Sequence, residues 1–152
     1  MTEPVFRDTK EVKVEAKSVS LWTLALNYVT GPVRIQMQVP VEDMTQWTYG
    51  SGKCGPGGTY DLSASAILPF APIGALIAKV GGGDAECPGL PATSGAAPQT
   101  LPTSKLYAVG RYSVIEVKAG EGGPLFLTMN DDVKNFVNHG GVLTVKVAIA
   151  VG

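Results

Sequence analysis

Apolar and polar side chains alternate along several short stretches of the chain. Within residues 10–20, Val12, Val14 and Ala16 alternate with charged residues, and residues 33–39 repeat the pattern. Successive side chains of a strand point to opposite faces, so a period of two predicts half-buried β-strands. The predicted strands are residues 10–20, 21–29, 33–39, 74–80, 107–117, 125–129 and 142–151. With no amphipathic helical pattern between them, we expect an all-β fold, an antiparallel β-sandwich of jelly-roll type.

Turn residues separate these runs and set their expected connections. The Thr-Gly-Pro sequence at residues 30–32 predicts a hairpin between the second and third strands. Residues 81–104 are rich in Gly, Pro, Ala, Ser and Thr, which predicts a surface excursion outside the core. At 152 residues the chain is expected to form a single domain, residues 1–152, with its own hydrophobic core.

Composition excludes several classes of protein. Hydrophobic residues make up 45% of the chain and charged residues 16%, and the net charge is −1, so neither disorder nor nucleic-acid binding is expected. The apolar run at residues 64–78 is broken by proline and glycine, which argues against a transmembrane segment. No signal peptide is visible, so we expect a cytoplasmic protein or export by a non-classical route. Cys54 and Cys87 leave a disulfide open.

Two features suggest nucleotide binding or catalysis, but the residues around them do not support either function. Gly50, Gly52 and Gly55 spell a GxGxxG sequence, but Gly and Pro follow it where a phosphate-binding helix would have to begin. His139 is the only histidine, and a lone loop histidine is expected to be exposed to solvent. No enzyme activity is predicted. Trp22 and Trp47 are expected to be core residues.

The stretch of residues 125–151 contains an unusually polar loop between two predicted strands. Six Asn, Asp and His residues crowd it: Asn130, Asp131, Asp132, Asn135, Asn138 and His139. A turn needs only one or two such residues. Calcium prefers carboxylate, amide and carbonyl oxygens, so a calcium loop is one reading, and an Asx-rich turn is the other.

Three segments resemble the LecA-like (PA-I type) galactophilic, calcium-dependent lectin family. They read GPGG, then GALIAKVG, then GPLFLTMNDDVKNFVNHGGVLTVKV, and the match spans residues 47–147, interrupted by residues 81–104. The resemblance implies a divergent member with a galactose-binding-domain-like β-sandwich. It also implies one calcium ion at the edge of the sandwich, which binds two adjacent sugar hydroxyls.

The same resemblance implies specific ligands. For calcium these are the backbone carbonyls of Tyr49 and Asn135 and the side chains of Asp131, Asn138 and His139. Asp132 replaces an uncharged residue of the family pattern and is a possible further ligand. Side-chain chemistry, and not the resemblance, suggests carbohydrate contacts at Tyr49, Asp131, Asp132 and Asn138, with Trp47 or Phe136 as an additional apolar face. His139 stands where the family has Asn. Residues 60–66 read YDLSASA where the family has His-Pro-x-Gln, so the resemblance does not predict which sugar is bound.

Together these expectations describe a non-catalytic, calcium-dependent carbohydrate-binding module with a glycan or small saccharide as its ligand. A homo-oligomer is expected, because linked shallow sites compensate for weak binding at each one. The alternative is a structural or assembly β-sandwich that keeps the lectin fold but has lost its metal and its sugar.

Overall fold

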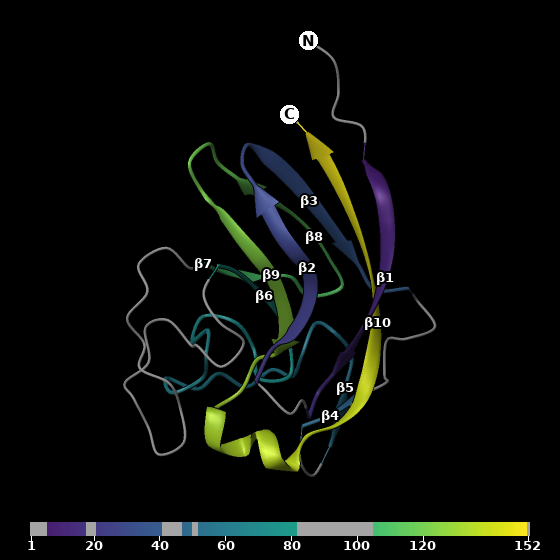
Figure 1. Cartoon of the computed structure of the whole chain (residues 1–152). Coiled ribbons are helices and arrows are strands. Elements are labelled where there is room, and N and C mark those ends of the chain that lie inside the picture. The colour runs from purple at the N-terminus through teal and green to yellow at the C-terminus, as the bar shows by residue number, and fades with distance from the viewer. Residues whose placement is uncertain (1–5, 18–20, 41–46, 50–51, 82–104, 152) are drawn as a thin grey trace.

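The computed structural model describes residues 6–17, 21–40, 47–49, 52–81 and 105–151. Two antiparallel sheets face each other, as Figure 1 shows. One sheet has the strand order β5-β4-β10-β3-β8, with β1 also paired to β10, and the other has the order β2-β9-β6-β7. The all-β sandwich predicted from the sequence is therefore confirmed.

The elements of the described residues are short and follow the sequence pattern. Those of the first sheet are β1 (Arg7–Glu15), β3 (Val33–Gln38), β4 (Trp47–Thr48), β5 (Lys53–Cys54), β8 (Tyr112–Val117) and β10 (Gly140–Val151). Those of the second are β2 (Thr23–Thr30), β6 (Leu76–Val80), β7 (Lys105–Ala108) and β9 (Gly122–Met129). A 3₁₀ helix, η2 (Val133–Asn138), forms within the polar loop. No helix in the described ranges is long and apolar enough to cross a membrane.

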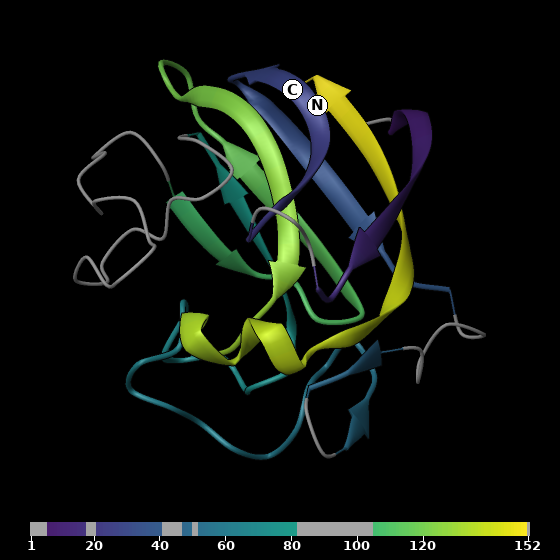
Figure 2. The same cartoon turned by 60° about the horizontal axis from the view of Figure 1, so that its bottom comes forward.

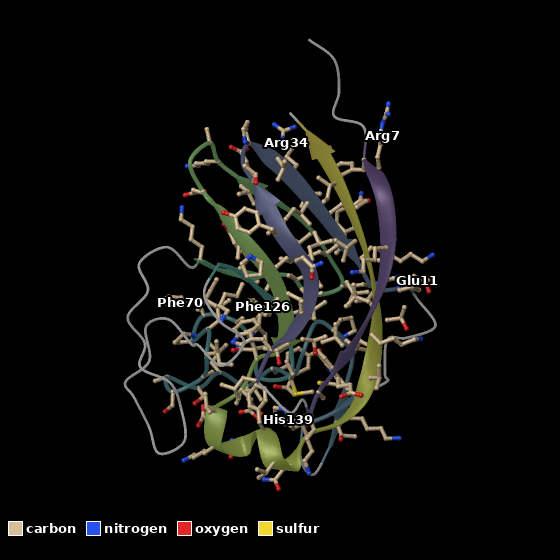
Figure 3. The ribbon with its side chains drawn as sticks, in the orientation of Figure 1. Arg7, Glu11, Arg34, Phe70, Phe126 and His139 are labelled. Carbon is tan, nitrogen blue, oxygen red and sulfur yellow. The ribbon has the colours of Figure 1, made fainter. Side chains whose placement is uncertain are left out.

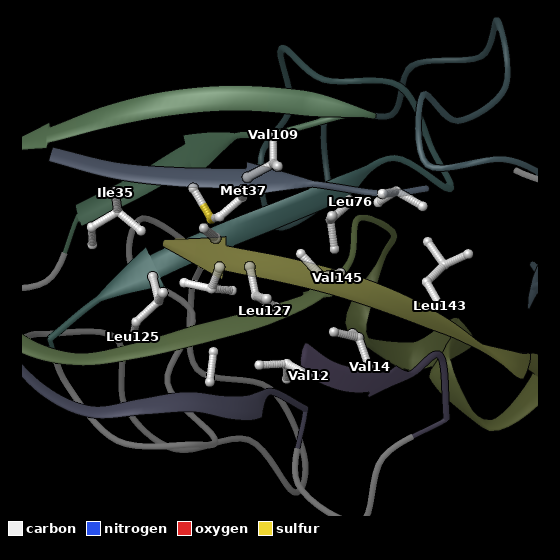
Figure 4. Close-up of a cluster of buried hydrophobic side chains, with 14 of the residues drawn as sticks. Val12, Val14, Ile35, Met37, Leu76, Val109, Leu125, Leu127, Leu143 and Val145 are labelled. Atoms are coloured by element: carbon white, nitrogen blue, oxygen red, sulfur yellow. The ribbon is translucent and has the colours of Figure 1, made fainter. Parts of the chain in front are cut away.

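The core lies between the two sheets. Strand β3 shows that the alternating pattern identifies the core residues. Val33, Ile35 and Met37 are buried, and the residues between them are more exposed. From the other sheet, Leu125 and Leu127 of β9 point into the same layer, as Figure 4 shows. The inward side chains are branched and apolar, and burying them supplies the main driving force for the sandwich.

The predicted hairpin between the second and third strands is wrong. Strand β2 pairs with β9, whereas β3 pairs with β10 and β8, so the turn at residues 30–32 carries the chain from one sheet to the other. In that position Val29 and Val33 both face the core, from opposite sheets. An alternating pattern shows which side chains are buried but does not identify the partner strand, and this is why the connection was misassigned.

The predicted strand at residues 107–117 is two strands that belong to different sheets. The chain turns at Gly110, whose φ of +64° is in the left-handed region, and β7 and β8 continue on either side of it. The surface excursion predicted at 81–104 lies outside the described residues except for Gly81.

Candidate functional site

The polar loop lies at one end of the sandwich, opposite the end where β10 finishes (Figure 1). Strand β9 ends at Met129, η2 follows after three residues, and β10 begins at Gly140. Strand β4 pairs with the start of β10 through Trp47–Gly141 and Thr48–Gly140, which brings the next residue, Tyr49, to the loop. In Figure 2 this end faces the viewer, with η2 beside the teal segment that contains residues 52–75.

Asn130, the first polar residue of the loop, fixes the neighbouring segment. Its side-chain Oδ1 accepts a hydrogen bond from the Leu68 N–H at 2.8 Å. Its Nδ2 lies 2.9 Å from the carbonyl oxygens of Leu68 and Ala71 and 3.2 Å from that of Pro72. The side chain is fully buried. Asn130 therefore braces residues 68–72 instead of facing a ligand, because every one of these contacts is internal.

Asp131 and His139 bind each other in the interior. The carboxylate Oδ2 of Asp131 is 2.9 Å from Nε2 of His139, and the relative exposures of the two side chains are 3% and 0%. The other ring nitrogen, Nδ1, is 3.0 Å from the carbonyl oxygen of Ala16, the residue that follows β1. The ring also packs against Phe136, with centroids 4.4 Å apart. Figure 3 shows His139 at the η2 end of the molecule.

The expected solvent exposure of His139 is therefore wrong. An isolated imidazole in a loop has no reason to leave water, but here an oxygen atom meets each ring nitrogen. Burying a polar ring is tolerated when both of its nitrogens are hydrogen-bonded. The two oxygens come from residues 123 and 8 positions away in sequence, so the surroundings of the ring were not readable from its neighbours in the chain.

The geometry limits what the pair can do chemically. The Ala16 carbonyl can only accept, so Nδ1 carries a hydrogen, and a second hydrogen lies between Nε2 and Oδ2 of Asp131. Both ring nitrogens are thus engaged inside the fold. A general base needs a nitrogen within reach of the substrate proton. The His139–Asp131 pair offers structure and no accessible base.

The second carboxylate oxygen of Asp131 also has internal partners. Its Oδ1 accepts from the Asp132 backbone N–H at 2.7 Å and from Nδ2 of Asn135 at 3.3 Å. These bonds close the first turn of the loop and hold η2 against the end of β9. Asp131 is 2% exposed as a whole residue. The carboxylate is surrounded by donors on both oxygens, which is why it tolerates this depth.

The remaining predicted site residues lie nearer the surface. Tyr49 and Asn135 are half-buried, and Asn138 at the end of η2 is exposed. Asp132 is half-buried, and its Oδ1 accepts a hydrogen bond from the hydroxyl of Ser63 at 2.7 Å. The backbone of Asp132 also bridges to Ala66. The structure thus gathers the five predicted calcium ligands at one end of the sandwich, but two of them are buried, two are half-buried and Asn138 is exposed.

These donors do not fit a calcium ion in this arrangement. Calcium takes six to eight oxygens, including carboxylates that are available to it. Here both oxygens of Asp131 receive hydrogen bonds, and His139 presents ring hydrogens rather than oxygen. Within the described ranges, no three His, Cys, Asp or Glu side chains form a metal-binding group. A bound metal therefore has no part in the function proposed for this site.

The apolar faces proposed from the sequence are not available. Trp47 is fully buried and donates its Nε1–H to the Gly74 carbonyl at 3.1 Å, and Phe136 is buried against His139. Trp22 is also in the core, as predicted. Tyr60, which the sequence reading did not single out, has a fully exposed ring. The sequence feature that could have indicated its exposure is its position three residues before Ser63, in a segment rich in short polar side chains.

Cys54 lies beneath this end of the molecule as a buried thiol. Its Sγ is 3.6 Å from the Gly74 carbonyl oxygen, and among the described residues it is a free cysteine. Burial raises the pKa of the Cys54 thiol, and a hydrogen bond with Trp47 opposes that shift. Such a thiol is a poor nucleophile, because the thiolate is the reactive form. Cys87, its potential partner, lies outside the described residues.

Comparison with known proteins identifies the fold. No family model and no curated protein matches the sequence. Among solved structures, the N-terminal domain of EclA, described as a PllA-like lectin, matches with a TM-score of 0.55 and 17% identity, over 90% of this chain and 92% of that one. The resemblance inferred from the sequence is thus supported at the level of a lectin-like fold, and the chain is a β-sandwich with the fold of a PllA-like lectin domain.

Proposed function

We propose that the chain is a non-catalytic carbohydrate-binding module whose sugar binds at the η2 end of the sandwich. The observation that carries the proposal is the exposed ring of Tyr60, on the segment that Ser63 fastens to Asp132. The shared fold with a lectin domain supports it. The buried state of the only histidine supports the non-catalytic part.

The surface groups at this end match what a sugar requires. Tyr60 offers an apolar ring face with a polar hydroxyl, which suits the C–H face of a pyranose. The carboxylate of Asp132 and the amide of Asn138 can bind hydroxyl groups. The Ser63–Asp132 bond holds that carboxylate in one orientation, so less conformational entropy is lost on binding.

The LecA-type assignment, with calcium bound by Tyr49, Asp131, Asn135, Asn138 and His139, stays a prediction from the resemblance. The donor geometry does not support the metal, so the proposed site relies on residues that are half-buried or exposed. Of the predicted sugar contacts, Asp132, Asn138 and Tyr49 stay in the proposal. Asp131 leaves it, because its side chain is 3% exposed and internally bonded.

A glycan array with two matched tyrosine variants tests the proposal. We expect the wild-type protein to bind a defined set of glycans, and Tyr60→Ala to lower the affinity at least about fivefold, which corresponds to roughly 1 kcal/mol. Tyr28→Ala is the control, because Tyr28 is also exposed but lies on β2, away from the loop. Equal losses in both variants would refute the placement of the site, and a blank array would refute sugar binding.

A structural module without a ligand is the second candidate, and one observation favours it. Five of the six polar loop residues make side-chain hydrogen bonds within the chain: Asn130, Asp131, Asp132, Asn135 and His139. A loop that only fastens the end of a sandwich would show the same bonds. A blank array together with a strong effect of loop variants on stability would select this function.

Oligomerisation belongs to the same proposal, because shallow sugar sites gain from avidity. Light scattering coupled to size-exclusion chromatography tests it, and a monomer over the working concentration range would exclude avidity within one assembly.

A further inference from the structure

The strongest disagreement between the sequence and the structure concerns the loop's one deeply buried carboxylate. The resemblance assigns Asp131 and His139 to a shared calcium ion, and the structure joins them directly, Oδ2 to Nε2, at 2.9 Å. A buried carboxylate needs compensation from a cation or from donors. Three donors supply it here: a ring nitrogen, a backbone N–H and a side-chain amide.

We infer that His139 replaces calcium in this loop and makes it metal-independent. The ring fills the role that a cation would have, because it satisfies Asp131 on one side and anchors the loop to the Ala16 carbonyl at 3.0 Å on the other. A metal would have to displace a hydrogen bond from a side chain that is 0% exposed. The loop is thus held in place by the chain itself, at any calcium concentration.

The packing around the ring supports a permanent arrangement. Phe136 covers one side of His139, with ring centroids 4.4 Å apart, and is itself buried. The ring therefore connects Phe136 of η2 and Asp131 to Ala16, the residue that follows β1 and is distant from both in sequence. Removing it from Asp131 would break contacts at all three.

The inference extends the proposed function by adding that sugar binding should not depend on calcium. In this respect alone it rests on the proposed function. The claim about the metal itself needs no sugar. A calcium response of the wild-type protein would overturn the inference and leave glycan binding possible, whereas a blank glycan array would overturn the proposed function and leave the inference intact.

Thermal unfolding with calcium and with a chelator tests the inference. We expect the wild-type Tm to be the same in millimolar calcium and in EGTA, because a ligand that does not bind the native state does not stabilise it. A wild-type Tm that rises by several degrees with calcium would overturn the inference.

The variant His139→Asn is the constructive test. It removes both ring hydrogens, supplies a side-chain oxygen and releases Oδ2 of Asp131. We expect it to gain a calcium-dependent rise in Tm of roughly 5–10 °C at a calcium concentration about a hundredfold above Kd. The double variant His139→Asn with Asp131→Asn is the control and should lose that rise. A folded His139→Asn protein without any calcium response would show that the ring is not what excludes the metal.

A spectroscopic measurement keeps the inference testable if the variant does not fold. His139 is the only histidine, so its ring signals in nitrogen-15 NMR need no assignment. We expect a protonated Nδ1 and a slowly exchanging hydrogen at Nε2, both unchanged on addition of calcium. Rapid exchange at Nε2, or a shift of the ring nitrogens with calcium, would overturn the inference.

Discussion

Replacing Asp131 tests how much the buried pair contributes to the stability of the fold. The variant Asp131→Ala removes the acceptor for His139 Nε2 at 2.9 Å, for the Asp132 N–H at 2.7 Å and for Asn135 Nδ2 at 3.3 Å. Breaking a buried pair by removing one partner costs about 3–5 kcal/mol, most of it from the polar group left behind. For a domain of this size that cost lowers Tm by roughly 6–20 °C.

The matched variant Asp131→Asn separates hydrogen bonding from size. Its Oδ1 can still accept from the Asp132 N–H, and its Nδ2–H can donate to Nε2 while His139 keeps the Nδ1–H for Ala16. Every buried group then has a partner, so we expect a loss below about 1.5 kcal/mol. Urea unfolding monitored by tryptophan fluorescence measures both variants. If Asp131→Asn were as destabilising as Asp131→Ala, or if Asp131→Ala cost less than about 1 kcal/mol, the account of the pair would be refuted.

Two further predictions concern the neighbouring residues Asn130 and Cys54. Asn130→Ala should lower the free energy of unfolding by about 2–4 kcal/mol, because it leaves the buried partners of Asn130 in residues 68–72 unsatisfied. Asn130→Asp should be at least as harmful, since it points a carboxylate at three carbonyl oxygens; a urea midpoint equal to wild type in either variant would contradict the bracing role. In a Cys87→Ser background, Cys54 should react with iodoacetamide at pH 8 at least about tenfold more slowly in the native than in the unfolded protein, because burial raises its pKa and fewer thiolates form. Equal rates in the two states would show that the thiol is accessible.

The sequence predicts the faces of the strands well and their partners poorly. Strand β3 alternates as its period-two pattern predicts, and β6, whose sequence is apolar except for Lys79, is buried at every position. The path of the chain between sheets at residues 30–32 and at Gly110 was not predictable, since a turn signal marks a change of direction and does not say which sheet receives the next strand.

The candidate site shows the same division. The sequence identified the polar loop, and the resemblance predicted that Tyr49 lies beside it. The pairing of β4 with β10 places Tyr49 there. What the sequence did not reveal is the direction of each side chain. Asn130 and His139 turn inward because backbone groups at residues 68–72 and 16, from distant parts of the chain, receive them, and Asp131 turns inward to bind His139. Composition alone left both a calcium loop and an Asx-rich turn open for these six residues.

The inferred metal-independence of the site is tested most directly by titration calorimetry with the wild-type protein. The glycan that binds best on the array is titrated once in millimolar calcium and once in EGTA. The account predicts the same Kd in both buffers, because Asp131 is satisfied by His139 and the proposed sugar contacts, Tyr60, Asp132, Asn138 and Tyr49, do not include it. Binding that disappears in EGTA would contradict it.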